Sequence, residues 1–147
     1  MISIEGRKRV IIEEVQPRVD CGRYPAKRTL GDRVTVTAAI FADGHDHVAG
    51  RLLFRHESEG EWRSTPMIAL TNDMWTATFT VDKLGTWNYT LEAWIDHFGT
   101  WCSDLQKRLA AQHDTAADSV TGSQNIPLAL RTGSALLEEV KTRAIGA

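Results

Sequence analysis

The sequence has little cysteine, no surplus of one charge and no long apolar run, and each absence removes a class of protein. Cys21 and Cys102 are the only cysteines, and they lack the CxxC spacing of a zinc site, so both are expected to be free thiols. Seventeen basic and nineteen acidic side chains give a net charge of -2, which provides no broad cationic field for nucleic acid. The N-terminal MISIEGRKRV is too short and polar for a signal peptide, and no run reaches the roughly 18 apolar residues that span a bilayer. We therefore expect a cytoplasmic protein with no nucleic-acid and no membrane partner.

Alternation of apolar and polar residues dominates the first two-thirds of the chain. With 147 residues, 42% of them apolar, the chain is long enough for one domain with a real core. Side chains at every second position share one face of a strand, so this period predicts β-structure. The predicted strands cover residues 9–15, 33–41, 48–56, 61–70, 74–81 and 86–96.

Turn residues separate these strands at intervals of about ten residues, and no helical pattern lies between them. Such spacing favours antiparallel pairing over a parallel sheet with crossover helices. The sequence therefore predicts a mainly β protein, an immunoglobulin-like antiparallel β-sandwich with a C-terminal helical segment. The sandwich domain is assigned to residues 1–98 and the helical extension to residues 99–147.

The extension has helical spacing of its apolar residues. Ser103 is a plausible N-cap, and Leu105 and Leu109 follow one turn apart. Residues 114–127, rich in Asp, Ser, Thr, Gly and Asn, are predicted to be a link, and a last helix is predicted to start at Ser134. On that last helix the sequence places three apolar residues on one face: Leu136, Leu137 and Val140.

The stretch FADGHDHVAG, residues 41–50, crowds Asp43, His45, Asp46 and His47 into five positions. On an extended strand, residues two apart project from one face, so His45 and His47 could form a metal pair. The other histidines lie on other elements, and a zinc site needs three or four ligands. We favour a turn between the second and third strands, with Asp43 bonded to nearby backbone amides, and predict no metal site.

Five tryptophans raise the alternative of stacking platforms for sugar rings. Strand phase assigns Trp87 and Trp75 to the core, because each alternates with other apolar residues. Trp94 has the opposite phase and lies among polar neighbours, where it is either a sugar platform or a residue covered by the following helix. Trp94 and Trp62 are therefore weak candidates for binding, together with the polar turn at residues 43–46.

No motif for independent catalysis is present. The sequence has no GxSxG, HExxH, P-loop or GxGxxG pattern, and its acidic residues cluster at strand ends and turns, where solvated surface is expected. No catalytic residue and no cofactor are predicted. A metal-dependent enzyme centred on His45 and His47 is the least favoured reading, because a third ligand is absent from the pattern.

Several ordered segments resemble a known module: VQPRVDCGRYPAKRTLGDRVTVTAAIFADGHD, EWRSTPM, NDMW and GTWNYTLEAWIDHFGTW. Over roughly residues 8–110 they resemble the N-terminal domain of the α-1,4-glucan:maltose-1-phosphate maltosyltransferases, a family of the α-amylase superfamily (glycoside hydrolase family 13). The matching positions are Pro17, Gly22, Arg23, Pro25, Lys27, Gly31, Asp43, Gly44, His45, Asp46, Trp62, Pro66, Met67, Trp75, Gly85, Tyr89, Ala93, Trp94, Asp96 and Trp101.

The resemblance implies a sandwich that precedes a catalytic (β/α)8 barrel, with a helical insertion near its end. In that family maltose passes from maltose 1-phosphate to an α-1,4-glucan, by carboxylates on the barrel. None of the barrel lies within these residues, so no catalytic role is carried over to any of them. The implied roles are support of the barrel and a share of a homodimer contact; direct binding of an α-glucan is the alternative.

This sequence departs from the family pattern at His47 and in length. His47 lies outside the D-G-H-D run, so the resemblance gives no support to a His-x-His metal pair. In the family a further strand returns to the sandwich after the helical insertion, whereas this sequence ends at KTRAIGA in a helical pattern. Either the sequence is a fragment or the sandwich lacks one strand, and an open edge predicts an oligomer or a covering helix.

Overall fold

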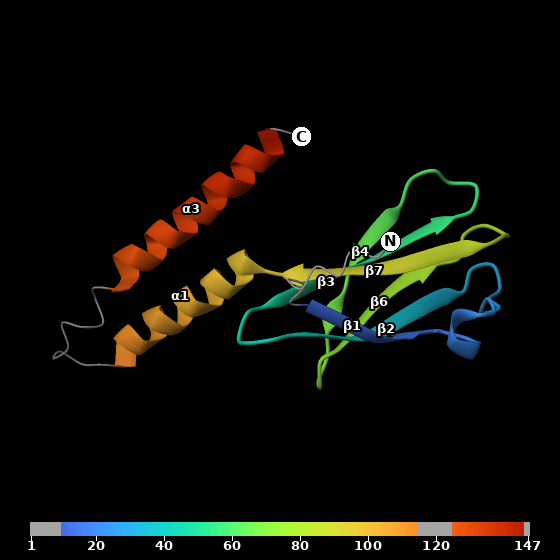
Figure 1. The fold of residues 1–147 in the computed structure, drawn as a ribbon, viewed down its shortest axis with the longest axis horizontal. Helices are drawn as coiled ribbons and strands as arrows, with labels where there is room; N and C mark the ends of the chain where they lie inside the picture. The colour runs from blue at the N-terminus through green and yellow to red at the C-terminus, as the bar shows by residue number, and fades with distance from the viewer. Residues whose placement is uncertain (1–9, 115–124, 146–147) are drawn as a thin grey trace, which may run out of the picture. The chain divides into compact units, whose positions relative to one another are not determined.

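Alternating apolar residues build the strands of the first of two compact units, which are divided between Ile95 and Asp96 (Figure 1). The computed structural model describes residues 10–114 and 125–145. In β2 (Arg33–Ala42) every second side chain from Val34 to Ile40 is buried. Because successive side chains of a strand point to opposite faces, this pattern buries one face of the strand and turns the other away from the core.

Two antiparallel sheets form this unit, and the mainly β sandwich predicted from the alternation is confirmed. One sheet has the order β1-β2-β6-β5 and the other β4-β3-β7. The remaining strands are β1 (Val10–Gln16), β3 (Val48–His56), β4 (Arg63–Pro66), β5 (Ile68–Ala69), β6 (Met74–Thr80) and β7 (Trp87–Ile95).

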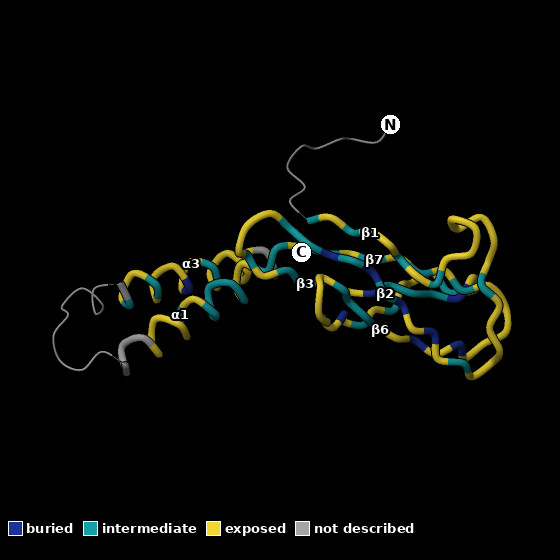
Figure 2. The backbone as a smooth tube through the Cα atoms, turned by 90° about the horizontal axis from the view of Figure 1, so that it is seen from below, coloured by how far each residue is buried: buried dark blue, intermediate teal, exposed yellow. Residues whose placement is uncertain are grey.

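The core lies between the sheets, and buried positions concentrate on their inner strands (Figure 2). Phe54 of β3 stacks on Phe79 of β6 with ring centroids 4.8 Å apart, which joins the two layers. Leu52 is fully buried beside them. The predicted core positions Trp75 and Trp87 both pack against this cluster, as their strand phase indicates.

The prediction of one continuous strand over residues 61–70 is wrong, because the structure divides this stretch between the two sheets. Residues 63–66 form β4 and pair with β3, whereas residues 68–69 form β5 and pair with β6. The switch falls at Met67, which is 6% exposed and whose backbone N–H donates to the carbonyl of Gly50 at 2.9 Å. Burying the Met67 side chain turns the chain from one layer to the other.

Within the described residues, β7 pairs with β3 alone, so one side of this nine-residue strand is a sheet edge. Unpaired N–H and C=O groups along such an edge favour pairing with another segment. The expectation that this edge is covered, either by a second subunit in an oligomer or by the C-terminal helix, remains a prediction.

The second compact unit contains α1 (His97–Asp114) and α3 (Asn125–Ile145), and both begin earlier than the sequence predicts. The starts expected near Ser103 and Ser134 are therefore wrong, as is a link that extends to residue 127; residues 115–124 of that link lie outside the described residues. Pro127 falls in the first turn of α3, where its missing N–H costs no helical hydrogen bond. Neither described helix is long and apolar enough to cross a membrane.

Candidate functional site

The FADGHDHVAG stretch is confirmed as a connection between strands. Residues 43–47 join the end of β2 to the start of β3, and the side chains of His45 and His47 are exposed. Nowhere in residues 10–114 and 125–145 do three or more His, Cys, Asp or Glu side chains gather as metal ligands would. Asp43, His45 and Asp46 thus lie together in the connection between β2 and β3.

Trp94 and Trp62 lie at the outer surface of the β4-β3-β7 sheet and are 44% and 40% exposed. An arginine of β3 covers each indole: the Arg51 guanidinium carbon lies 6.0 Å from the Trp94 ring, and that of Arg55 lies 4.5 Å from Trp62. Arg51 also pairs with Glu92 of β7 at 2.6 Å. A cation thus approaches one face of each indole, more closely at Trp62 than at Trp94.

A groove of about 930 Å³ opens beside the segment that joins β1 to β2. Its floor is formed by apolar and aromatic side chains of both sheets, among them Val34, Phe79 and Val81, which also belong to the core. Tyr89 anchors the segment over the groove, since its hydroxyl donates to the Pro17 carbonyl at 2.7 Å. Core side chains therefore lie at the base of the groove.

Four exposed cations line the same groove: Arg18, Arg23, Lys27 and Arg28. Burial raises the pKa of the Tyr89 hydroxyl, and the positive charges of Arg18 and Arg28 oppose that rise. No Asp or Glu is among the described residues that line it. The groove therefore combines an apolar floor with a basic rim.

Three cations of the sandwich outside the groove have carboxylate partners: Arg51, Arg63 and Lys83. Arg63 bonds Asp82 at 2.9 Å and Glu59 at 3.2 Å while its guanidinium lies over Trp87, and Lys83 bonds Glu59 at 2.7 Å. The hydrogen bond from Arg63 holds the pKa of Asp82 below its ordinary value, and the one from Lys83 does the same for Glu59. By contrast, none of the four rim cations forms an ion pair with another described residue.

In the helical unit, Asp96 is the N-cap that the sequence analysis missed. Its carboxylate accepts from the Gly99 N–H at 2.8 Å, and its carbonyl accepts from the Thr100 N–H at 2.9 Å. The first bond satisfies an amide group that the first turn of a helix leaves without a partner, and the second is the first regular hydrogen bond of the helix. Asp96 has the chemistry of a cap, but in the sequence it continues the alternation of the preceding strand.

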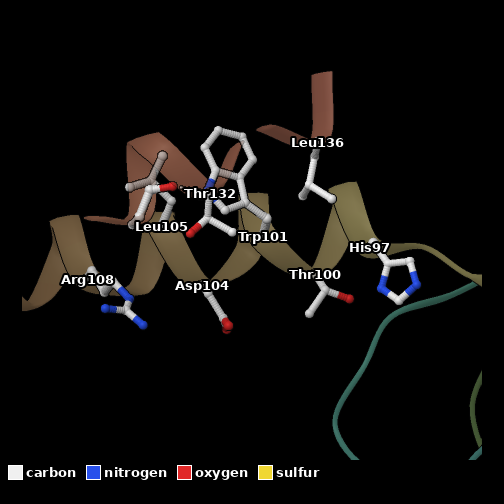
Figure 3. Close-up of a pocket in the computed structure, with 9 residues that line it drawn as sticks. His97, Thr100, Trp101, Asp104, Leu105, Arg108, Thr132 and Leu136 are labelled. Atoms are coloured by element: carbon white, nitrogen blue, oxygen red, sulfur yellow. Dashed lines mark hydrogen bonds between the residues drawn. The ribbon is translucent and has the colours of Figure 1, made fainter. Parts of the chain in front are cut away.

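Trp101 of α1 joins the two helices. Its indole N–H donates to the Ala129 carbonyl, and its ring lies so close to Gly133 that a Cβ at that position would overlap it. Figure 3 shows Trp101 reaching toward α3 across a cleft of about 320 Å³, while Asp104 points away from it. Because the polar side chains around this cleft do not converge, the cleft is a packing seam.

Apolar side chains of α3 lie on two sides of that helix, which corrects the single face expected for Leu136, Leu137 and Val140. Leu136 lines the seam with α1. Leu137 and Val140 are 55% and 63% exposed, and Leu130, one heptad before Leu137, is 52% exposed. We call Leu130, Leu137 and Val140 the α3 stripe; successive residues three and seven apart share one side of a helix.

The described residues thus form an antiparallel sandwich with a basic groove and a pair of packed helices with an exposed apolar stripe. A model of the family described as α-1,4-glucan:maltose-1-phosphate maltosyltransferase, domain N/S, matches residues 8–146. The chain belongs to this family. The match confirms the resemblance and extends it through both helices.

Three relatives carry the name α-1,4-glucan:maltose-1-phosphate maltosyltransferase. The protein of Chlorobaculum tepidum is 44% identical over 84% of this chain, that of Methylacidiphilum infernorum 38% over 82%, and that of Myxococcus xanthus 36% over 92%. The matched segment makes up 18%, 18% and 19% of these relatives. This chain thus spans about a fifth of their length.

Sequence reasoning found the turns and the exposed tryptophans but missed the basic groove. Its cations are spread over residues 18–28, the RVDCGRYPAKR segment that carries part of the resemblance. The spacing alone does not bring them to one rim, because that depends on the path of the segment over β7. The density of basic residues around Tyr24 and Pro25 was the available signal.

Proposed function

We propose that this chain is the accessory module of a maltosyltransferase that moves maltose from maltose 1-phosphate to α-1,4-glucans. In this proposal the immunoglobulin-like sandwich supports the catalytic barrel, the helical hairpin contributes to a homodimer contact, and the chemistry takes place outside these residues. Family membership and the small share of each relative that the chain spans support it.

The observation that carries the subunit contact is the α3 stripe. Two helices packed along one seam bury one side of each, and Leu130, Leu137 and Val140 stay more than half exposed. Apolar side chains gathered on one helix side mark interaction surfaces in proteins. A second hairpin packed against this stripe would cover it as the helices of a bundle cover one another.

A chimera tests both roles. This chain replaces its matched segment in the Chlorobaculum tepidum enzyme, and maltosyl transfer and molar mass are measured. We expect an active dimer, and we expect Leu137→Lys to raise the dimer dissociation constant about a hundredfold, because burying an unpaired ammonium costs several kcal/mol. Leu84→Lys is the control, since Leu84 is 79% exposed on the sandwich unit. A dimer of unchanged affinity in Leu137→Lys would refute the stripe as the contact.

A glucan-binding surface is the second candidate, because Trp94 and Trp62 lie exposed on one sheet face. We expect no change in tryptophan fluorescence on titration with millimolar maltoheptaose, since Arg51 and Arg55 cover the two rings. The same titration of Arg51→Ala tests whether uncovering Trp94 matters. A saturable change in the unmodified chain that Trp94→Ala abolishes would favour glucan binding instead.

A further inference from the structure

We propose that the basic groove docks an acidic segment of the remainder of the maltosyltransferase, with an apolar side chain of that segment on its floor and carboxylates against its rim. This inference rests on the proposed function and assigns the surface through which the module meets the rest of the enzyme. The occupant is a polypeptide of the same enzyme.

The floor gives the first argument. Val34, Phe79 and Val81 are 4%, 6% and 7% exposed, yet all three line the groove. These core side chains lie at the base of a groove of about 930 Å³ that is also lined by Trp87 and Tyr89. An apolar side chain that enters the groove would therefore gain contacts with an apolar and aromatic base.

The rim gives the second argument. Arg51, Arg63 and Lys83 all have carboxylate partners in the sandwich, whereas the four rim cations have none among the described residues. These cations are spread over eleven positions of the chain, from residue 18 to residue 28. A row of carboxylates on a polypeptide complements such a spread, whereas a single phosphate would need donors that converge on one point.

The exposed residues of the segment give the third argument. Tyr24 is 56% exposed and Val19 44% exposed beside the rim, and a backbone bridge between these two residues shapes the turn. Tyrosine and arginine side chains at a surface are the types that protein interfaces favour. The relatives contain about four-fifths of their length beyond the matched segment, so the enzyme has ample chain to occupy the groove.

Cys21, exposed within this segment, reports on docking. Its rate of labelling by a maleimide is measured in the isolated chain and in the Chlorobaculum tepidum chimera. We expect labelling about tenfold slower in the chimera, and less protection at high salt, because salt screens the rim charges. The reference site is Thr71→Cys, an exposed position before β6 and thus at the opposite end of that strand from the groove. It should react equally in both proteins.

Charge reversal tests the assignment directly. Arg23→Glu and Lys27→Glu should each remove most of the Cys21 protection, with every rate in the chimera divided by that of the same variant in the isolated chain. This division cancels the direct effect of the new charge on the thiol. Arg33→Glu is the matched control, because Arg33 is an exposed cation outside the groove and without an ion pair among the described residues.

The outcomes separate this inference from the function on which it rests. A chimera without maltosyl transfer overturns both. An active chimera in which Cys21 reacts as fast as in the isolated chain overturns only the docking surface, and so does equal protection in Lys27→Glu and Arg33→Glu. Protection of Cys21 in the isolated chain by millimolar glucose 1-phosphate would make the groove a sugar-phosphate site and would also overturn the acidic segment.

Discussion

Gly85→Ala should destabilise the sandwich by roughly 3 kcal/mol or more, through two separate effects. Gly85 has φ +133°, a backbone conformation that side chains with a Cβ rarely adopt. A Cβ there would also overlap the imidazole of His56 and the carboxylate of Glu57. His56 is 6% exposed, so displacing it breaks hydrogen bonds that water cannot readily replace.

The bonds at risk close the turn beside the groove. Nδ1 of His56 accepts from the Ser58 N–H at 3.2 Å, so the other nitrogen, Nε2, carries the proton and donates to the Leu84 carbonyl at 3.0 Å. The Glu57 carboxylate accepts from the Thr86 N–H at 3.0 Å, and this bond lowers the pKa of Glu57. One added methyl group would therefore separate the chain near Glu57 from the chain near Gly85.

Urea unfolding measures the stability that Gly85→Ala loses. Two other glycines, substituted in the same way, separate the contribution of backbone strain from that of steric overlap. Gly31 has φ +89° and nothing within 4 Å of an added Cβ, so Gly31→Ala measures backbone strain alone and should cost about 1 kcal/mol. Gly60 has open space and no positive φ, so Gly60→Ala should be nearly neutral. Equal stabilities of the Gly31 and Gly85 variants would show that the contact with His56 has no energetic weight.

The strands were predictable because burial on one face leaves a period of two in the sequence. In β2 the buried Val34, Val36, Ala38 and Ile40 carry that period directly. The switch at Met67 was not predictable, since the alternation continues through residues 61–70 while the pairing partner changes from β3 to β6. Periodicity reports which side chains are buried and carries no information about the strand they pair with.

The helix starts were mispredicted for a related reason. Asp96 ends the alternation of β7 and also caps α1, so one residue satisfies both patterns. Gly99, Pro127 and Gly133 all weaken a helical interpretation of the sequence. The structure accommodates each: the Gly99 N–H donates to the Asp96 carboxylate, Pro127 lies in a first turn, and Gly133 is the small residue that Trp101 requires. These explanations depend on tertiary contacts or on the exact residue at which the helix begins, and neither can be read from the apolar periodicity.

The candidate site was less accessible than the fold. The resemblance correctly gave the family, and the polar turn at residues 43–47 was correctly assigned to a connection. The basic groove requires residues 18–28 to lie beside β7, where Tyr89 holds the segment by its bond to Pro17. A bond between residues 72 positions apart leaves no periodic trace in the sequence.

Gly133→Val should separate α3 from α1 and weaken the dimer at the same time. A Cβ at Gly133 would occupy the space of the Trp101 benzene ring, so the indole must leave and its bond to the Ala129 carbonyl is lost. Overpacking of this kind costs typically 1–3 kcal/mol, and valine adds a small penalty for its β-branched side chain in a helix. Because two helices share a single seam, we expect this loss to unpair the hairpin rather than to be absorbed by repacking.

The measurement is helical circular dichroism during thermal unfolding, with molar mass from light scattering. Ser134→Val is the matched control, because Ser134 is the exposed next residue and receives the same side chain without facing Trp101. Trp101→Leu removes the overlapping ring, so the double variant Trp101→Leu, Gly133→Val should recover part of the stability lost in Gly133→Val alone, as a double-mutant cycle reveals. Additive losses in that cycle would mean that the two residues do not interact. Gly133→Val could lower the unfolding temperature of the helices while the molar mass remains that of a dimer. That result would mean that the dimer does not need the paired helices, and that the subunit contact comes from a surface other than the α3 stripe.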